Sequence, residues 1–182
     1  MSSTIKVNNI QNLAGTSAIT IDSSGNVTES NFEIDMYRLT TDVTTDTTAI
    51  TNWERVDDAS FAKIGTGITE SSGTWTFPRT GLYRVDVFAN IFSTNVDQST
   101  LLRINVTTNN SSYDTVSQLQ EGTTNTQDVN QNGCMFALIN VTDTSNVKFQ
   151  ISSSSMETGG KIASDTDFSK TAVLIERKGN AQ

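Results

Sequence analysis

The sequence predicts an all-β protein, an antiparallel jelly-roll sandwich with a short N-terminal β-hairpin arm. Two observations carry this prediction. The 182 residues include 29 Thr, 21 Ser and 17 Asn; threonine favours a pleated, half-buried surface, and Ser, Asn and Gly favour turns. Apolar and polar residues also alternate with a period of two in short runs separated by turn residues. About eight to ten such runs are typical of a sandwich or jelly roll.

Residues 1–35 are predicted to form an attachment or trimerisation arm. Ile5 and Val7 alternate with polar neighbours, and a second short strand at 18–21 runs into the turn residues 22–26, which predicts a hairpin. Its few apolar residues cannot build a core within one chain. We expect copies from other subunits or a docking partner to stabilise it; a floppy arm is the alternative. The residues assigned to the arm are Ile5, Val7, Ile10, Leu13, Ile19 and Ile21.

Residues 36–182 are predicted to form the head, which is organised around residues 74–93, TWTFPRTGLYRVDVFANIFS. A short strand there runs into a turn at Pro78 and then into a long alternating strand. One face of that strand carries Tyr83, Val85, Val87, Ala89 and Ile91. The other predicted strands of the head are 36–41, 50–56, 61–64, 100–107, 113–119, 134–141, 147–151 and 171–177. Two long polar loops are predicted at 121–133 and 152–167.

The segment 134–141 carries apolar residues on both faces. A sandwich strand is normally apolar on one face only, so we expect a second subunit to cover the other face. A loop of the same chain is the alternative cover. Phe88 and Phe92, on the polar face of their strand, also favour a second subunit. Cys134, the only cysteine, is expected to be a small buried hydrophobe.

The composition argues against several functions. The formal net charge is −8, and the 12 basic residues form no stripe, so nucleic-acid binding is not expected. We expect no secretory signal and no membrane-spanning segment, because neither pattern is visible in the sequence. The chain has no histidine, no G-x-S-x-G elbow and no P-loop, so we expect no enzyme activity.

Acidic residues leave two alternatives open. The pairs Asp57–Asp58 and Asp165–Asp167 could serve glycoside cleavage, although solvated loop acids are the commoner interpretation. The stretches at 143–146 and 164–167 supply oxygen atoms for calcium but lack the ordered spacing of an EF-hand loop. We therefore expect no cofactor, with a structural calcium ion as the alternative.

Ligand binding is expected at loops gathered at one end of the sandwich. These loops are 94–98, 109–113, 121–132 and 152–168. Tyr113 and Phe168 are their aromatic residues and are the candidate ligand contacts, because an exposed ring and amide groups commonly hold sugars. The alternative is that both rings pack at the edge of the core.

The phrase GTWTFPRTGLYRVDVFANI resembles the signature of the jelly roll shared by tumour necrosis factor (TNF) and the globular heads of complement component one q. Gly73, Phe77, Pro78, Gly81 and Tyr83 stand on that signature. The closing strand of the family looks like TAVLIER near the C-terminus, so the resemblance covers about residues 50–178. It implies a ten-stranded jelly-roll trimer with strands 134–141 and 171–175 along the threefold axis. The interface residues are then Phe88, Phe92, Cys134, Phe136, Leu138, Val173 and Ile175.

The N-terminal phrase SSTIKVNNIQNLAGTSAITIDSSGNVT is similar to the opening of structural proteins of tailed bacteriophages. Together the two resemblances imply a virion surface protein. It would be a homotrimeric decoration or short-fibre protein whose arm anchors it to capsid or tail proteins. The alternative is a carbohydrate-binding adhesin or receptor-binding fibre tip, whose partner would be a host-surface glycan.

Overall fold

The computed structural model describes residues 7–29, 31–124 and 128–182, and divides the chain into two compact units, 1–32 and 33–182. The division falls three residues before the boundary expected from the sequence. It does so because the strand expected to begin at Met36 already begins at Ile34, and Glu33 and Asp35 are buried within the second unit.

The first unit is a three-stranded antiparallel sheet, which contains the predicted hairpin around the turn at 22–26 and one further strand before it. Its strands are β1 (Asn9–Gln11), β2 (Ser17–Ile21) and β3 (Val27–Glu29). The Asp22 carboxylate accepts hydrogen bonds from the backbone of Ser24 and Asn26, which closes the turn between β2 and β3. The first strand lies later than predicted, and Ile5 falls outside the described residues.

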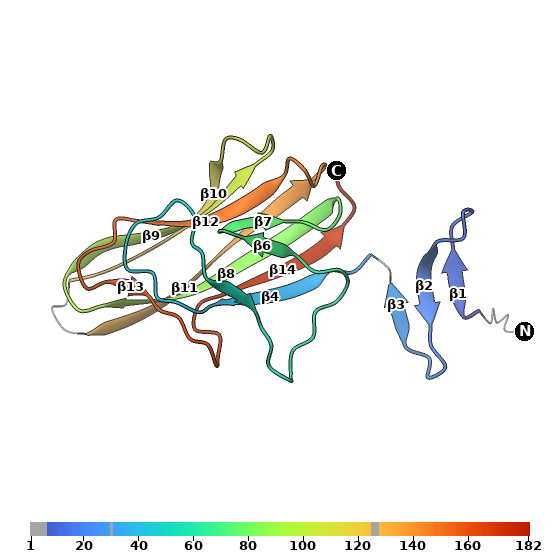
Figure 1. The fold of residues 1–182 in the computed structure, drawn as a ribbon, viewed down its shortest axis with the longest axis horizontal. Helices are drawn as coiled ribbons and strands as arrows, with labels where there is room; N and C mark the ends of the chain where they lie inside the picture. Colours follow the sequence, from blue (N-terminus) through green and yellow to red (C-terminus); the bar gives the residue numbers. More distant parts are fainter. Residues whose placement is uncertain (1–6, 30, 125–127) are drawn as a thin grey trace, which may run out of the picture. The chain divides into compact units, whose positions relative to one another are not determined.

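The second unit, which we call the head, contains two packed sheets (Figure 1). The five-stranded sheet has the order β10-β9-β12-β7-β6, and the six-stranded sheet has the order β11-β8-β14-β4-β5 with β13 paired to β8. The strands are β4 (Ile34–Leu39), β5 (Trp53–Arg55), β6 (Thr69–Ser71), β7 (Thr74–Thr76), β8 (Gly81–Ser93), β9 (Asp97–Thr107), β10 (Asp114–Thr123), β11 (Val129–Val141), β12 (Lys148–Ser154), β13 (Lys161–Ile162) and β14 (Ala172–Gly179).

The core lies between these two sheets and is built around Trp75. Its ring stacks on Phe149 at 5.3 Å between centroids and meets Tyr37 and Trp53 edge-on at 4.8 and 5.6 Å. Such aromatic pairs add roughly 0.5–1.5 kcal/mol beyond the area they bury. The five residues predicted to share one face of β8 all point into this core and are buried. The alternation in 74–93 is therefore confirmed.

Two of the predicted interface residues belong to this core. Val173 and Ile175 are 0% and 1% exposed. β14 lies between β8 and β4, and Val173 aligns with the inward-facing Val87 on one side and Tyr37 on the other. Side chains alternate along a strand, so Leu174 faces outward in their place. The assignment of Val173 and Ile175 to a subunit interface is corrected accordingly.

The long polar loop predicted at 121–133 is also wrong. β10 continues through Thr123, and β11 already begins at Val129. Backbone hydrogen bonds extend the pairing of β10 with β9 and of β11 with β8 beyond the core. Polar side chains are tolerated in these strand ends because the backbone makes the pairing. The predicted strand at 61–64, by contrast, is reduced to one bridge between Ile64 and Ile34.

The turn between β6 and β7 fixes a neighbouring segment of the head. Ser72 and Gly73 both have positive φ, at 52° and 78°, as a tight hairpin turn requires. A Cβ atom on Gly73 would lie 2.8 Å from both the Ala49 Cβ and the Ile50 carbonyl oxygen. Glycine is therefore needed at position 73 for its backbone angle and for the close approach of residues 49–50.

We predict that Gly73→Ala lowers the free energy of unfolding by about 1–2 kcal/mol from the positive φ alone, with a further loss from the close contact. Urea denaturation measures the change. Gly179→Ala is the matched control, because nothing lies within 4 Å of a Cβ atom there. Equal effects of the two substitutions would contradict both the cost of the positive φ at residue 73 and the tight packing of residues 49–50 on this turn.

Candidate functional site

Two surfaces of the head are candidates for function: the outer face of the six-stranded sheet, and a polar groove on the outer face of the five-stranded sheet. Large apolar side chains gather on the first. Phe88, Phe136 and Leu138 are 46%, 59% and 61% exposed, and Cys134 is also exposed. Cys134 aligns with Phe88 in the pairing of β11 with β8, so these side chains share one surface.

This apolar face continues across the sheet. The register aligns Phe136, Asp86, Leu174 and Met36 on the four adjacent strands β11, β8, β14 and β4. A hollow of about 250 Å³ lies on this face, and its lining residues are Met36, Asp86, Val87, Phe88, Cys134, Ala172 and Leu174. We call the outward-facing residues Met36, Phe88, Cys134, Phe136, Leu138 and Leu174 the apolar face.

The charges on the apolar face compensate one another. Arg84 and Asp86 form an ion pair at 2.8 Å, and the Arg84 guanidinium also lies 5.2 Å from the centre of the Phe136 ring. An internally paired Arg and Asp leave little net charge on the face. The surface is therefore mainly apolar in character.

The residues predicted from the sequence to form the subunit interface lie in three different places. Phe88, Cys134, Phe136 and Leu138 come together on the apolar face, so the expectation that Cys134 is buried is corrected for the single chain. Phe92 is half-buried, and the Lys161 ammonium lies 5.4 Å from its ring centre. Val173 and Ile175 lie inside. Within the described part of the chain no loop covers Phe136 and Leu138, so cover by the same chain is not observed.

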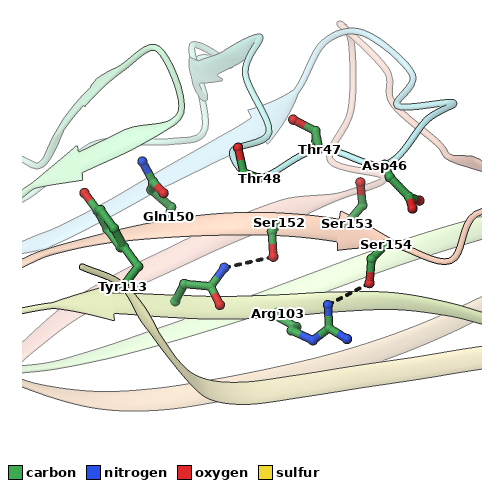
Figure 2. Close-up of a pocket in the computed structure, with 10 residues that line it drawn as sticks. Asp46, Thr47, Thr48, Arg103, Tyr113, Gln150, Ser152, Ser153 and Ser154 are labelled. Carbon is green, nitrogen blue, oxygen red and sulfur yellow. Dashed lines mark hydrogen bonds between the residues drawn. The ribbon is translucent and has the colours of Figure 1, made fainter. Parts of the chain in front are cut away.

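The polar groove lies along β12 and has a volume of about 550 Å³ (Figure 2). Gln150, Ser152 and Ser154 are alternate residues of β12 and face outward into it. Arg103 and Asn105 from β9 line one side, Tyr113 lies at one end, and the segment 46–48 lines the opposite side.

The segment 46–48 is held along the edge of β12 where β7 has ended. Thr47 and Ser153 exchange two backbone hydrogen bonds at 2.9 and 3.1 Å, and Ile50 donates to the Ile151 carbonyl at 2.7 Å. The Asp46 carboxylate accepts a hydrogen bond from the Met156 amide at 3.0 Å. This side of the groove is therefore built by backbone pairing.

Hydrogen bonds fix the side chains that line the groove. Asn105 donates to the Ser152 hydroxyl at 2.8 Å, and Arg103 Nη1 donates to the Ser154 hydroxyl at 2.6 Å. Arg103 Nε also donates to Gln118 at 2.9 Å. These contacts link β9, β10 and β12 side by side.

The two predicted ligand aromatics are not brought together. Tyr113 lines the groove and is half-buried, whereas Phe168 is exposed elsewhere and packs against Lys170. The predicted loops do not share one end of the sandwich either. Asn95 bonds to Thr158 before β9 begins, and the turn at Asn110 bonds to Asn146 after β9 ends. The expectation of a single loop cluster is therefore wrong.

Much of the groove was missed by the sequence analysis. Ser152, Ser153 and Ser154 belong to the predicted ligand loop 152–168, whereas the residues not predicted are Asp46, Thr47, Thr48, Arg103, Asn105 and Gln150. The outward positions of Arg103 and Asn105 could be read from the alternation of their strand. The sequence does not show that β12 lies beside β9 or that residues 46–48 border β12, because these pairings join segments far apart in the chain.

The acidic residues considered for catalysis or metal binding have structural partners. Asp57 and Asp58 both bind the buried Arg38, together with Glu54. Asp165 accepts a hydrogen bond from the Asp167 amide and lies 3.7 Å from Lys170. In the described ranges no three His, Cys, Asp or Glu side chains are grouped to hold a metal ion, and no helix is long and apolar enough to cross a membrane.

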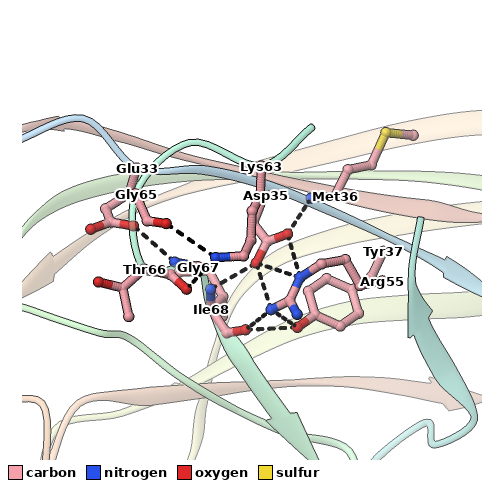
Figure 3. Close-up of polar contacts among 10 residues, drawn as sticks. All are labelled: Glu33, Asp35, Met36, Tyr37, Arg55, Lys63, Gly65, Thr66, Gly67 and Ile68. Carbon is pink, nitrogen blue, oxygen red and sulfur yellow. Dashed lines mark hydrogen bonds and ion pairs between the residues drawn. The ribbon is translucent and has the colours of Figure 1, made fainter. Parts of the chain in front are cut away.

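A buried ionic cluster lies at the start of the head (Figure 3). The Asp35 carboxylate accepts hydrogen bonds from Arg55 at 2.9 and 3.0 Å and from the Ile68 amide at 2.8 Å. Arg55 also donates to the Tyr37 hydroxyl, which itself donates to the Ile68 carbonyl. Glu33 accepts from the Gly67 amide and pairs with Arg79 at 2.8 Å. This cluster ties β4 to the chain before β6.

Comparison with known proteins identifies the fold. No family model and no curated protein sequence matches the chain. The structure of Eiger TNF from S. frugiperda is 13% identical, with a TM-score of 0.56, over 84% of this chain and 96% of that one. Murine APRIL at pH 5.0 is 8% identical, with a TM-score of 0.56, over 81% of this chain and 99% of that one. The all-β, TNF-like jelly roll is therefore confirmed, and the phage origin stays a prediction.

We predict that alkaline conditions destabilise the head. Burial raises the pKa of Tyr37 and of Tyr83 to about 12. An unfolded tyrosine ionises near pH 10, so the unfolded chain loses protons first and the free energy of unfolding falls between about pH 10 and 12. Below pH 10 the two tyrosines contribute their full stability.

Tyr83→Phe tests this prediction by urea denaturation at pH 8 and pH 11. At pH 8 the variant should lose about 1 kcal/mol, because the hydrogen bond from Tyr83 to the Arg79 carbonyl is absent. Its further loss at pH 11 should be smaller than that of the unsubstituted protein, because phenylalanine does not ionise. An unchanged pH dependence would contradict the raised pKa.

Proposed function

We propose that the protein is a non-catalytic structural protein of a virion surface, and that it assembles as a homotrimer through the apolar face of the head. The single observation that carries the self-association is the exposure of Phe88, Phe136 and Leu138 on one sheet face. The TNF-like fold supports it, because the family resemblance implies a trimer of such jelly rolls.

A second copy of the chain is the occupant that suits the apolar face best. Monomeric soluble proteins rarely expose a large contiguous apolar patch, and covering such a patch stabilises a complex by about 25 cal/mol per Å². The Arg84–Asp86 pair is neutral as a whole, so it would not repel the same pair on an identical face. The patch also extends to β11, an edge strand of its sheet, where an adjoining subunit can approach.

The first unit, residues 1–32, is proposed as the arm that attaches the trimer to capsid or tail proteins of the same particle. Its described residues Val7, Ile10, Leu13 and Val27 are exposed. A sheet of three short strands without a buried apolar face is marginally stable in water. A partner that covers these side chains would supply the missing burial. The resemblance of residues 2–28 to phage structural proteins supports a partner on the virion.

The alternative function is a carbohydrate-binding adhesin or receptor-binding fibre tip. The polar groove along β12 is the observation that favours it, and it lies on the sheet opposite the apolar face. Recognition and self-association can therefore coexist in one molecule.

We predict that Phe136→Asp converts the assembled protein to monomers or aggregates. A carboxylate buried without a partner in an interface costs several kcal/mol. Sedimentation velocity measures the oligomeric state. Phe168→Asp is the matched control, because Phe168 is 54% exposed but lies off the apolar face; this variant should sediment like the unsubstituted protein.

The thiol of Cys134 supplies a second measurement for this proposal. It is exposed in the single chain, so a covering subunit should slow its reaction with a thiol reagent in the unsubstituted protein and Phe136→Asp should restore fast reaction. A sedimentation coefficient of a monomer for the unsubstituted protein, with rapid labelling of Cys134, would refute the trimer.

We predict that deletion of residues 1–32 leaves a folded, self-associating head that no longer joins the particle. The head contains its own core, and the strands it needs lie after residue 32. Circular dichroism, sedimentation and co-sedimentation with particles lacking this protein measure the three properties. An unfolded head, or one that still joins the particle, would contradict the role given to the arm.

A further inference from the structure

We propose that the polar groove along β12 binds a short, neutral oligosaccharide. This site belongs to a single copy of the chain, so the proposal depends neither on the trimer nor on a place in a virion. The volume of about 550 Å³ lies within the range of roughly 300–1,000 Å³ that small-molecule sites occupy.

The groove offers the mixture of donors and acceptors that sugar hydroxyl groups require. A hydroxyl both donates and accepts, so a polyol needs both kinds of partner at close spacing. Within the described part of the chain, several polar atoms on the lining residues make no hydrogen bond. They are Arg103 Nη2, Asp46 Oδ2, Gln150 Oε1 and the hydroxyls of Thr48 and Tyr113. The hydroxyl protons of Ser152 and Ser154 are also available, because both oxygens act as acceptors.

These groups are held in place before any ligand arrives. Ser152 and Ser154 are fixed by Asn105 and Arg103, and the Asn105 carbonyl oxygen accepts from Thr115 at 2.8 Å. Gln150 donates to the Thr74 hydroxyl at 3.0 Å, which leaves its carbonyl oxygen directed to the groove side of β12. Ligand binding therefore need not order many side chains, which lowers the entropic cost of binding.

The aromatic ring needed for a sugar lies at one end of the groove. Tyr113 is half-buried and lines the groove together with the polar side chains of β9 and β12 (Figure 2). An aromatic ring with a polar tip suits a sugar, whose C–H face is apolar and whose edge carries hydroxyl groups. The combination of this ring with serine and amide groups favours a saccharide over a purely ionic ligand.

The charges of the groove and of the whole chain favour a neutral sugar over an acidic one. Arg103 and Asp46 both line the groove, from opposite sides, so their charges offset each other. The whole chain carries a net charge of −8, which disfavours the approach of a polyanion. A ligand with many hydroxyl groups and no charge therefore fits the groove better than a sulfated or polyuronic chain.

The test uses the full-length protein on a panel of neutral and acidic oligosaccharides, followed by calorimetric titration with the best neutral ligand. We expect Tyr113→Ala and Asn105→Ala to weaken that binding at least tenfold. Tyr113→Phe keeps the ring and should weaken it less than Tyr113→Ala. Phe168→Ala, an exposed aromatic away from the groove, is the control and should change the affinity less than twofold.

Each outcome decides the proposal. Neutral sugar binding that is lost in the groove variants, with melting curves like that of the unsubstituted protein, supports it. If a variant melts early, amide NMR shifts of residues 103–105 and 150–154 on adding the sugar to the unsubstituted protein give the location instead. Binding of acidic sugars only, binding of none, or equal loss in Phe168→Ala would overturn the proposal. Sedimentation of the same samples separates these results from any failure of the trimer.

Discussion

The packing of Trp75 between the two sheets is the constraint on which the rest of the head depends. Its ring contacts Phe149 of one sheet and Tyr37 and Trp53 of the other, so it sets the spacing of both layers. The inward side chains of β8 and β14 pack in this core. Because side chains alternate along a strand, this packing also determines which residues face outward. The apolar face and the polar groove are thus the two outer surfaces of one sandwich, available for separate tasks.

Local alternation made much of this arrangement predictable. The inward residues of 83–91 were recognisable from a period of two, and the TNF-like signature around Pro78 added the jelly roll. The same periodicity identified Phe136 and Leu138 as outward-facing. What failed was the transfer of family positions onto Val173 and Ile175, because a shift of one residue along a strand moves a side chain to the opposite face.

Polar strands and long-range pairings could not be predicted from residue types. The residues after Glu121 look like a loop because nearly all of them are polar, yet the backbone of residues 121–123 and 129–133 completes the ladders of β10 and β11. The groove is similar. Ser152 and Ser154 are ordinary surface residues until β9 on one side and residues 46–48 on the other are placed beside them. Backbone pairing between distant segments carries no signature in the side chains.

The buried ionic cluster directly follows the arm in the chain, and this position has a mechanical consequence. Any tension on residues 1–32 enters the head at Glu33 and passes into β4, an interior strand that pairs with β14 over five residues. A pull along β4 loads those backbone bonds in shear, all together, instead of opening them one after another. The ion pairs of Asp35 and Glu33 add resistance at the point of entry. If residues 1–32 attach the protein as proposed, the head therefore resists unfolding under a pull along β4.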